Sequence, residues 1–511
     1  MEKVRVRFAP SPTGPLHIGG VRTALYNYLL AKKTGGTFIL RIEDTDQTRY
    51  VPGAEQYIID ALKWCGLKPD ESPEMGGEYG PYRQSERKAL YHKYAMQLIE
   101  NDKAYYAFDT AEELDQRREE EKAKVNHNFK YDAKARMEMN NSLTVGKEET
   151  QRRLQSGEPY TIRLKVPVDE IITFKDIVRG EVSFQSNELD DKILLKGDGM
   201  PTYHLANIVD DYSMKISHVI RGEEWLSSTA HHVLLYRAFG WEDHMPQFAH
   251  LPLILKPNGK GKLSKRDGAK LGIPVFPLSW KGNSEEESFS GFNDFGFLPG
   301  AVINFLAFLG WNPGTEQEIF ALEELIEAFD LNKIGKAGAK FDFDKAKWFN
   351  QQYIIGSETD ALIDLLQIEM KAKGYQKERS FVKGFVELMK ERVVFLNDFF
   401  VNGYYFFENV SSYDEKNIRK KWKPEHRAKF DDLKADLLAL EVYENEKIKQ
   451  QVEAFMSANE LKYGDVLPIL RIALSGTTKG PAIFEMMELL GKEEVDRRIQ
   501  VAYAKFDEIK A

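Results

Sequence analysis

A strand, a tight turn and a helix follow one another in residues 4–33, and this order is typical of the start of an α/β fold. Residues 4–8 alternate apolar and basic side chains, as a half-buried strand does. Residues 21–33 carry apolar side chains three or four positions apart, which predicts a helix. The turn between them reads APSPTGPLHIGG. Because a helix N-terminus presents unpaired N–H groups and a partial positive charge, this turn is suited to hold a phosphate.

Strand-like and helix-like segments alternate over residues 1–100 and again over 200–270. Between them, residues 110–155 are highly charged and helical in pattern, and residues 160–196 form short β-rich runs. We therefore expect an α/β domain with a mostly parallel sheet, split by an inserted segment and binding ligands at the carboxyl ends of its strands. The apolar run LPLILK, residues 251–256, is expected to be one of these strands.

From residue 297 onward the apolar spacing is close to 3.6, which predicts an almost entirely helical region. The segment 275–296 is rich in Gly, Ser and acidic residues and is expected to be a surface loop insertion. Residues 418–429 form a basic patch that includes a Trp and a His. This patch is either a solvated helix end or a nucleic-acid contact.

Composition narrows the classes of protein. The 511 residues are enough for several domains. Cys65 is the sole cysteine, so an internal disulfide and a Cys-rich zinc site are both excluded, and Cys65 itself is expected to fill a core position. The net charge of −9 argues against nonspecific polyanion binding but leaves local RNA contacts open. The N-terminus lacks the apolar region of a signal peptide and INFLAFLGW is too short to span a bilayer, so we expect a cytoplasmic protein without membrane contact.

Two short motifs carry the chemistry. His17 lies just before Gly19 and Gly20, where it can donate a hydrogen bond to a phosphate oxygen and the glycines allow close approach. The second motif, GKGKLSKRDGAK at residues 259–270, places Lys262, Ser264, Lys265 and Arg266 in a Gly-rich loop. Cationic loops of this kind neutralise charge that develops on a transferring phosphoryl or nucleotidyl group. The loop has neither the spacing of a P-loop nor that of a dinucleotide fingerprint.

Together these motifs carry a family resemblance. HIGG and KLSKR resemble the HIGH and KMSKS signatures of class I aminoacyl-tRNA synthetases, in variants that are familiar among them. The words RFAPSPTGPLHIGGVRTAL, LRIEDTD, YRQSER, PTYHLANIVDD, VIRGEEW and KLSKR occur in the order seen in bacterial glutamyl-tRNA synthetases. The resemblance is strong over residues 1–350 and weaker beyond them. It implies a Rossmann-like catalytic domain with an inserted α+β connective domain, followed by all-helical stem-contact and anticodon-binding domains.

The same resemblance implies domain boundaries and partners. The catalytic domain would comprise residues 1–104 and 197–296, interrupted by the acceptor-binding insertion 105–196, with the stem-contact domain at 297–375 and the anticodon-binding domain at 376–511. The expected reaction joins L-glutamate to tRNA-Glu through a glutamyl-adenylate, with ATP as substrate and Mg²⁺ accompanying it. Some relatives carry a Cys-based zinc site in the insertion; this chain has no cysteine there, so we expect no zinc. A monomer is the family norm.

The resemblance also implies roles for the residues at the matching positions of each motif. Glutamate carries two carboxylates and one ammonium group, for which two arginines and an acid are the natural complement. The resemblance assigns catalysis to His17, Lys262 and Lys265. It assigns ATP binding to Thr13, Gly14, His17, Gly19, Gly20, Glu224, Leu253, Ile254, Ser264 and Lys265. It assigns glutamate binding to Arg7, Ala9, Ser11, Glu43, Tyr203, Asn207 and Arg221. It assigns tRNA contact to Arg419, Lys420, Lys421 and Lys423.

Within the glutamate set, we expect Glu43 and Ser11 to meet the ammonium group and Arg7 to meet the side-chain carboxylate, although which arginine binds which carboxylate stays open. Tyr203 and Asn207 would share one face if their segment is helical. We also expect that replacing Arg7 leaves folding intact.

Four other classes of protein were weighed. A glutaminyl-tRNA synthetase has a β-barrel anticodon domain, whereas this C-terminal third is helical in pattern. A truncated paralogue that glutamylates a modified tRNA base lacks the anticodon domain, and a nucleotidylyltransferase acting on small molecules has no need of so long a helical region. A non-catalytic RNA-binding protein would be expected to lose His17, Lys265 or Arg7. The sequence leaves open whether tRNA-Gln is charged as well as tRNA-Glu.

Overall fold

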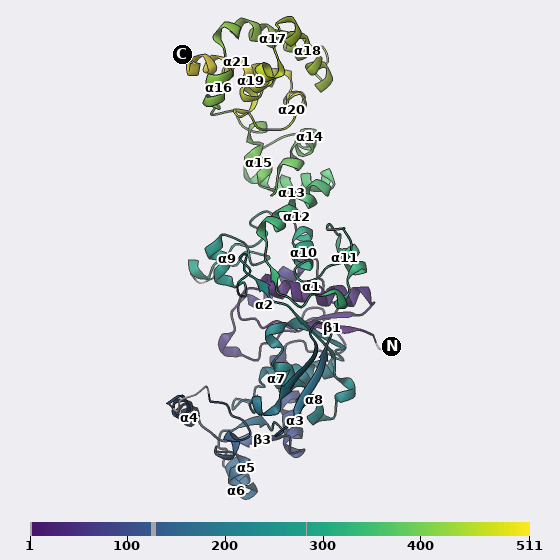
Figure 1. Ribbon diagram of the computed structural model, residues 1–511, viewed down its shortest axis with the longest axis vertical. Helices are drawn as coiled ribbons and strands as arrows, with labels where there is room; N and C mark the ends of the chain where they lie inside the picture. Colours follow the sequence, from purple (N-terminus) through teal and green to yellow (C-terminus); the bar gives the residue numbers. More distant parts are fainter. Residues whose placement is uncertain (1–2, 124–128, 283, 511) are drawn as a thin grey trace. The chain divides into compact units, whose positions relative to one another are not determined.

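The computed structural model describes residues 3–123, 129–282 and 284–510 (Figure 1). One residue of the expected surface loop 275–296 therefore lies outside the described residues, as do five of the expected insertion 105–196. The chain forms two compact units, one of residues 1–295 with 299–343 and one of residues 296–298 with 344–511. Among the described residues, no helix is long and apolar enough to cross a membrane.

A six-stranded sheet forms the centre of the first unit, in the order β2-β1-β8-β9-β5-β6. All neighbouring pairs are parallel except β5 with β6, as expected for an α/β domain. Strand β1 lies between β2 and β8, so it pairs with one strand from each of the α/β stretches expected over residues 1–100 and 200–270. The strands of this sheet are β1 (Arg5–Phe8), β2 (Thr37–Leu40), β5 (Ile171–Asp176), β6 (Gly180–Gln185), β8 (His218–Gly222) and β9 (Gln247–Leu251).

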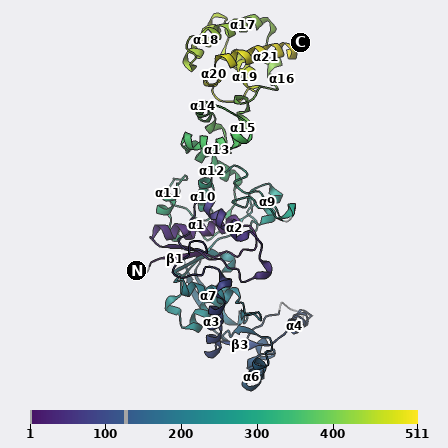
Figure 2. The ribbon, with the colours of Figure 1, turned by 180° about the vertical axis from the view of Figure 1, so that it is seen from behind.

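Helices cover both faces of this sheet. Figures 1 and 2 show α1 and α2 on one side of β1, and α7 and α8 on the other. The expected helix over residues 21–33 is confirmed as the longer α1, and the segment of Tyr203 and Asn207 is helical, as α7. The helices are α1 (Ile18–Lys33), α2 (Ala54–Trp64), α3 (Lys88–Glu100), α7 (Tyr203–Ser213), α8 (Ser228–Phe239), α9 (Lys265–Leu271), α10 (Pro299–Ala307) and α11 (Leu322–Ala328).

The inserted segment divides between two sheets. Strands β3 (Ala104–Ala107), β4 (Thr161–Leu164) and β7 (Ile193–Leu195) form a separate antiparallel sheet, beside the helices α4 (Ala111–Ala123), α5 (Ser142–Val145) and α6 (Lys147–Gln155). The β5–β6 hairpin instead extends the central sheet. The side chains of β5 alternate between exposed and buried, and its Phe174 packs against Phe248 of β9 with ring centroids 5.8 Å apart. The predicted insertion 105–196 therefore supplies one edge of the central sheet, which the sequence did not indicate.

The expected strand over residues 251–256 is wrong in its bounds. The chain forms β9 up to Leu251, and Pro252 then interrupts it because proline lacks the N–H that a ladder needs. A short strand, β10 (Ile254–Leu255), follows and pairs with β11 (Ala339–Lys340). This break turns residues 252–254 toward the cavity described below.

Residues 299–343 pack with the first unit because α1 binds their backbone. The Tyr26 hydroxyl donates to the Ala307 carbonyl at 2.9 Å, and the Arg22 guanidinium donates to the Leu309 carbonyl at 2.7 Å. The compact units therefore do not divide at residue 297, and the five-part domain division stays a prediction.

The second unit is helical over its described residues, as expected from its apolar spacing. Its helices are α12 (Phe343–Gly356), which begins at the boundary, α13 (Thr359–Ala372), α14 (Arg379–Met389), α15 (Asp398–Asn402), α16 (Glu415–Lys421), α17 (Arg427–Ala439), α18 (Asn445–Ala458), α19 (Tyr463–Ser475), α20 (Ile483–Leu490) and α21 (Lys492–Lys510).

Candidate active site

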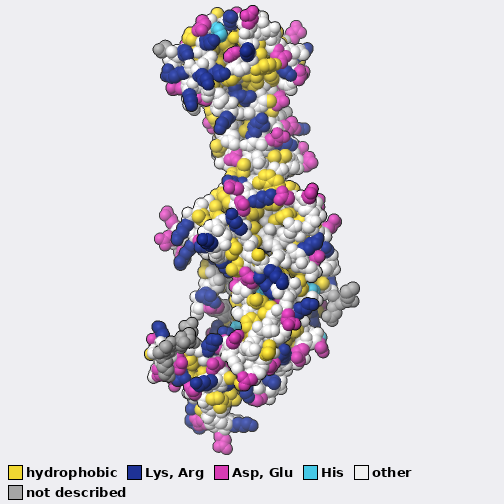
Figure 3. All heavy atoms as spheres, in the orientation of Figure 1, with side chains coloured by type: hydrophobic (Ala, Val, Ile, Leu, Met, Phe, Trp, Pro, Cys, Tyr) yellow, Lys and Arg dark blue, Asp and Glu magenta, His cyan; other side chains and the backbone are white. Residues whose placement is uncertain are grey.

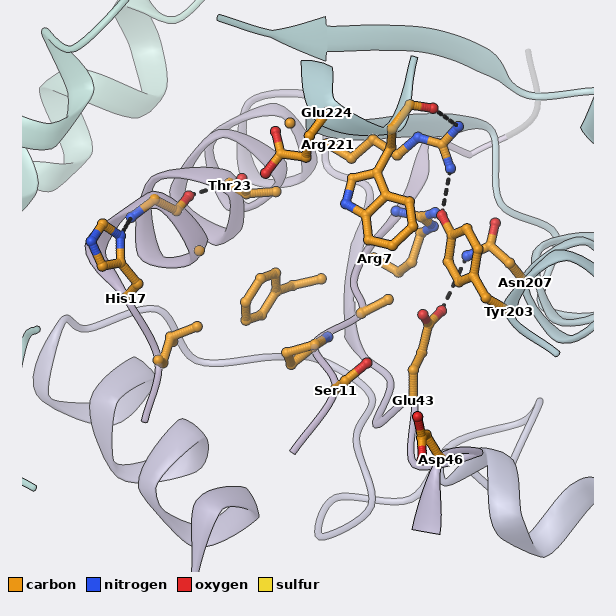
Figure 4. Close-up of a pocket in the computed structure, with 18 of the residues that line it drawn as sticks. Arg7, Ser11, His17, Thr23, Glu43, Asp46, Tyr203, Asn207, Arg221 and Glu224 are labelled. Carbon is orange, nitrogen blue, oxygen red and sulfur yellow. Dashed lines mark hydrogen bonds between the residues drawn. The ribbon is translucent and has the colours of Figure 1, made fainter. Parts of the chain in front are cut away.

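A cavity of about 810 Å³ opens at the carboxyl ends of β1 and β8, next to the N-terminus of α1 (Figure 4). This is the position at which open α/β sheets bind their ligands. The predicted site residues that line it are Arg7, Ala9, Ser11, His17, Gly19, Gly20, Glu43, Tyr203, Asn207, Arg221, Glu224, Leu253, Ile254 and Lys262. The predicted residues outside its lining are Thr13, Gly14, Ser264 and Lys265.

His17 caps the N-terminus of α1. Its Nδ1 accepts a hydrogen bond from the Gly19 N–H at 3.1 Å, so the ring proton lies on Nε2. The buried Nε2 has no hydrogen-bond partner among the described residues. Burial, together with the charges of Lys265 and Lys262, lowers the pKa of His17 to about 4. His17 is therefore neutral and keeps one N–H group that has no partner among the described residues.

Lys265 meets the first motif at Gly14. A Cβ added to Gly14 would lie 3.3 Å from the Lys265 Nζ, and Gly14 has a φ of +135° that favours glycine. The Phe276 ring packs between the motifs, with its centroid 5.9 Å from the His17 ring and 5.7 Å from the Lys265 Nζ. Burial lowers the pKa of Lys265. The turn with His17 and the loop with Lys265 thus both lie next to Phe276. Lys265 itself lines a smaller cavity of about 230 Å³.

Two further residues of the cationic loop have protein partners. The Lys262 Nζ lies 2.8 Å from Glu224 Oε1. Burial raises the pKa of Glu224, but the hydrogen bond and charge of Lys262, a backbone hydrogen bond and the charge of Arg22 together hold that pKa below its usual value. The Ser264 hydroxyl donates to Asp267 at 2.5 Å, and the same carboxylate accepts from the Ser264 N–H at 2.9 Å, as part of a capping box at the start of α9. Ser264 therefore starts the helix that presents Lys265.

Arg7 belongs to a buried network of charges. Its guanidinium donates to both carboxylate oxygens of Asp211, at 3.0 and 3.2 Å. Arg41 donates to the same carboxylate at 2.7 Å and to Glu43 at 2.9 Å. The Asn207 amide also donates to Glu43, at 3.1 Å, as Figure 4 shows. Burial raises the pKa of Glu43, and Arg41 and Arg7 offset part of that rise.

The network contains equal numbers of guanidinium and carboxylate groups. Arg87 completes it by donating to Asp210 at 2.7 Å, and Arg41 lies 3.8 Å from the same carboxylate. The three guanidinium groups of Arg7, Arg41 and Arg87 therefore face the three carboxylates of Glu43, Asp210 and Asp211. A substrate that enters the cavity finds Arg7 already paired.

Arg221 differs from Arg7 in its partners. Its guanidinium is 5 % exposed and donates to Tyr203 Oη at 2.7 Å, Thr229 Oγ1 at 2.8 Å and His250 Nε2 at 3.1 Å. All three acceptors are uncharged, and Arg221 forms no ion pair among the residues that the structure describes. The buried Arg22 guanidinium also donates to carbonyls alone, but the charges of Glu223 and Glu224 stabilise it. Arg221 therefore presents to the cavity a guanidinium that no carboxylate of the described residues contacts directly.

Several residues of the site were missed by sequence reasoning. Asp211 is one, although its spacing could have found it, because Asp211 follows Asn207 by four positions on the same helix. Arg41, Thr229 and His250 carry no local signal, since their partners come from distant parts of the chain.

The basic patch of residues 418–429 lies in the second unit. Figure 3 shows Lys and Arg side chains gathered over α16. Arg419, Lys420 and Lys423 are exposed, whereas Lys421 donates to the Gly464 carbonyl at 2.7 Å. Trp422 is fully buried and donates to Asp507, so the aromatic side chain in the patch belongs to the core.

Within the described ranges, no group of three or more His, Cys, Asp or Glu side chains could hold a metal ion. Cys65 is buried at the end of α2, and burial raises the pKa of its thiol, as expected for a core residue.

Comparisons with known proteins show the family to which the chain belongs. A family model described as the catalytic domain of class I tRNA synthetases (E and Q) matches residues 3–348, and one described as an anticodon binding domain matches residues 359–503. The chain is 53 % identical to a glutamate–tRNA ligase of Christiangramia forsetii, over 98 % of both chains. It is 55 % identical to that of Flavobacterium johnsoniae, over 98 % of this chain and 99 % of the relative. The crystal structure of a glutamate tRNA ligase from Elizabethkingia meningosepticum, in complex with its amino acid, matches with a TM-score of 0.96 and 50 % identity, over 99 % of this chain and all of that one.

Proposed function

Because the chain belongs to the glutamate–tRNA ligases of the class I tRNA synthetases, we propose that it activates L-glutamate with ATP and transfers it to tRNA-Glu. In the first step a carboxylate oxygen of glutamate attacks the α-phosphorus of ATP and the bond to pyrophosphate breaks. In the second step a hydroxyl of the terminal ribose attacks the carbonyl carbon, and AMP leaves.

Positioning and electrostatics supply the catalysis in this proposal. His17 donates its Nε2–H to a phosphate oxygen of ATP, since that donor is buried and has no protein partner among the described residues. Lys265 stands beside Gly14 and neutralises the departing pyrophosphate, with Lys262 in support. Thr13, Gly19 and Gly20 belong to the turn and helix start that would hold ATP, and Leu253 and Ile254 line the cavity for adenine. Mg²⁺, bound with ATP, would add charge neutralisation at the phosphates.

The preference for glutamate over glutamine rests on the balance of charges in the cavity. The single observation behind it is the guanidinium of Arg221, which no carboxylate in the described ranges contacts directly, beside a network in which each guanidinium faces a carboxylate. Glutamate brings one net negative charge to this cavity, whereas glutamine brings none. Arg221 therefore pairs with one carboxylate of glutamate, and the Glu43 carboxylate with Ser11 accepts its ammonium group.

The remaining assignments are proposals of the same kind. Arg419, Lys420 and Lys423 would meet tRNA phosphates, and the insertion would hold the acceptor end. A cytoplasmic location, a monomeric state and the absence of zinc stay predictions.

Aminoacylation by the purified protein tests the proposal. Radiolabelled glutamate, ATP and Mg²⁺ are incubated with transcripts of tRNA-Glu and, separately, of tRNA-Gln. Label on tRNA-Glu alone identifies a discriminating ligase, and label on both identifies a non-discriminating one. Absence of label on both transcripts contradicts the proposal.

A further inference from the structure

Arg221 is held by a chain of side chains that ends in the insertion. Its Nε donates to His250 Nε2 at 3.1 Å, and the other ring nitrogen of His250, Nδ1, lies 2.6 Å from Asp176 Oδ2. His250 belongs to β9 and is fully buried, and Asp176 is the last residue of β5 and is 1 % exposed. Neither side chain lines the cavity, so both act on a ligand only through Arg221.

The direction of each hydrogen bond follows from the chemistry of its donor. An arginine Nε can only donate, so His250 Nε2 accepts and carries no proton. The proton of the neutral ring therefore lies on Nδ1, which donates it to the Asp176 carboxylate. That carboxylate is fixed in turn by the N–H groups of Val178 and Arg179, at 2.9 and 2.8 Å. The turn of the β5–β6 hairpin thus sets the orientation of the imidazole.

A neutral acceptor holds a guanidinium without cancelling its charge. Arg7 is oriented by the Asp211 carboxylate and is neutralised by it. Arg221 is oriented by an imidazole, while the carboxylate that orients the imidazole stays one residue further away. We propose, on the basis of the proposed function, that Asp176 and His250 are positioning residues that aim the Arg221 guanidinium at a glutamate carboxylate and leave its charge for that substrate.

Aminoacylation kinetics at saturating tRNA-Glu test this role, with the KM for glutamate and the KM for ATP measured separately. His250→Leu removes both hydrogen bonds and is expected to raise the KM for glutamate by about tenfold or more, because Arg221 loses its orientation. The KM for ATP is expected to stay within about twofold of its original value. His250→Gln keeps one donor and one acceptor and is expected to recover most of the lost glutamate affinity.

His231 offers a matched control. It is a buried histidine of the neighbouring helix α8, and its Nε2 lies 2.9 Å from the Asp190 carbonyl rather than near Arg221. His231→Leu is expected to leave the KM for glutamate within about twofold. If His250→Leu fails to fold, Asp176→Asn replaces it in the test. This substitution weakens the acceptor of the His250 Nδ1–H and is therefore also expected to raise the KM for glutamate.

Two results would overturn the inference. One is a folded His250→Leu or Asp176→Asn protein with an unchanged KM for glutamate. The other is an equal rise in both KM values, which indicates general loosening of the site. Failure of the unmodified protein to transfer glutamate at all would contradict the proposed function instead.

Discussion

Replacing Arg7 by Met is expected to reduce folding stability as well as glutamate binding. The Arg7 guanidinium is 3 % exposed and donates twice to the buried Asp211 carboxylate. Removing one partner of a buried ion pair costs about 3–5 kcal/mol, because the other charge stays buried. Asp211 keeps its hydrogen bond from Arg41 at 2.7 Å, so we expect the lower end, about 3 kcal/mol. That corresponds to a change of about 150-fold in the folding equilibrium.

Denaturant unfolding, followed by circular dichroism, measures this loss in Arg7→Met. Adding Asp211→Asn to Arg7→Met removes the stranded carboxylate and is expected to recover part of the lost stability. The reasoning is refuted if Arg7→Met unfolds at the same denaturant concentration as the unmodified protein. An unchanged KM for glutamate in the folded variant would separately remove Arg7 from the binding site.

Four other perturbations test separate parts of the site. Lys265→Met is expected to lower kcat by about 10²-fold or more, as loss of one preorganised charge-stabilising group does, and a near-normal single-turnover rate would show that its loop is not catalytic. Acidification from pH 7 to 5 is expected to remove about 2 kcal/mol of stability through His17, because the unfolded ring binds a proton near pH 6.5 and the folded ring only near pH 4. Urea unfolding at both pH values checks this, with a correspondingly smaller loss in His17→Gln. Glu223→Ala frees the Leu253 N–H, which donates to that carboxylate at 2.9 Å, and is expected to raise the KM for ATP severalfold while the KM for glutamate stays constant. Lys420→Glu is expected to raise the KM for tRNA and to flatten its dependence on salt, and an unchanged salt slope would place Lys420 outside the tRNA contact.

The sequence could predict candidate site residues where they lie within one short stretch of the chain. The helix that His17 caps, the cationic loop and the residues around Tyr203 and Asn207 each lie within a short stretch of chain, and these stretches line or border one cavity. Parallel strands explain this outcome, because their carboxyl ends meet at the same edge of the sheet.

Interactions between distant segments could not be predicted in this way. The structure argues against the expectation that replacing Arg7 leaves folding intact, because its partner, Asp211, lies in α7, far along the chain. For the same reason the sequence did not predict that the β5–β6 hairpin joins the central sheet and brings Asp176 to His250. A residue's type shows its charge, but only the fold shows whether that charge is already neutralised.

The central claim is that the cavity is matched to the charge of glutamate through Arg221. The most direct test is a side-by-side aminoacylation of tRNA-Glu by the purified protein with glutamate and with glutamine, at equal concentrations. The charge balance predicts transfer of glutamate and little or no transfer of glutamine. Equal transfer of the two amino acids, or a preference for glutamine, would contradict it.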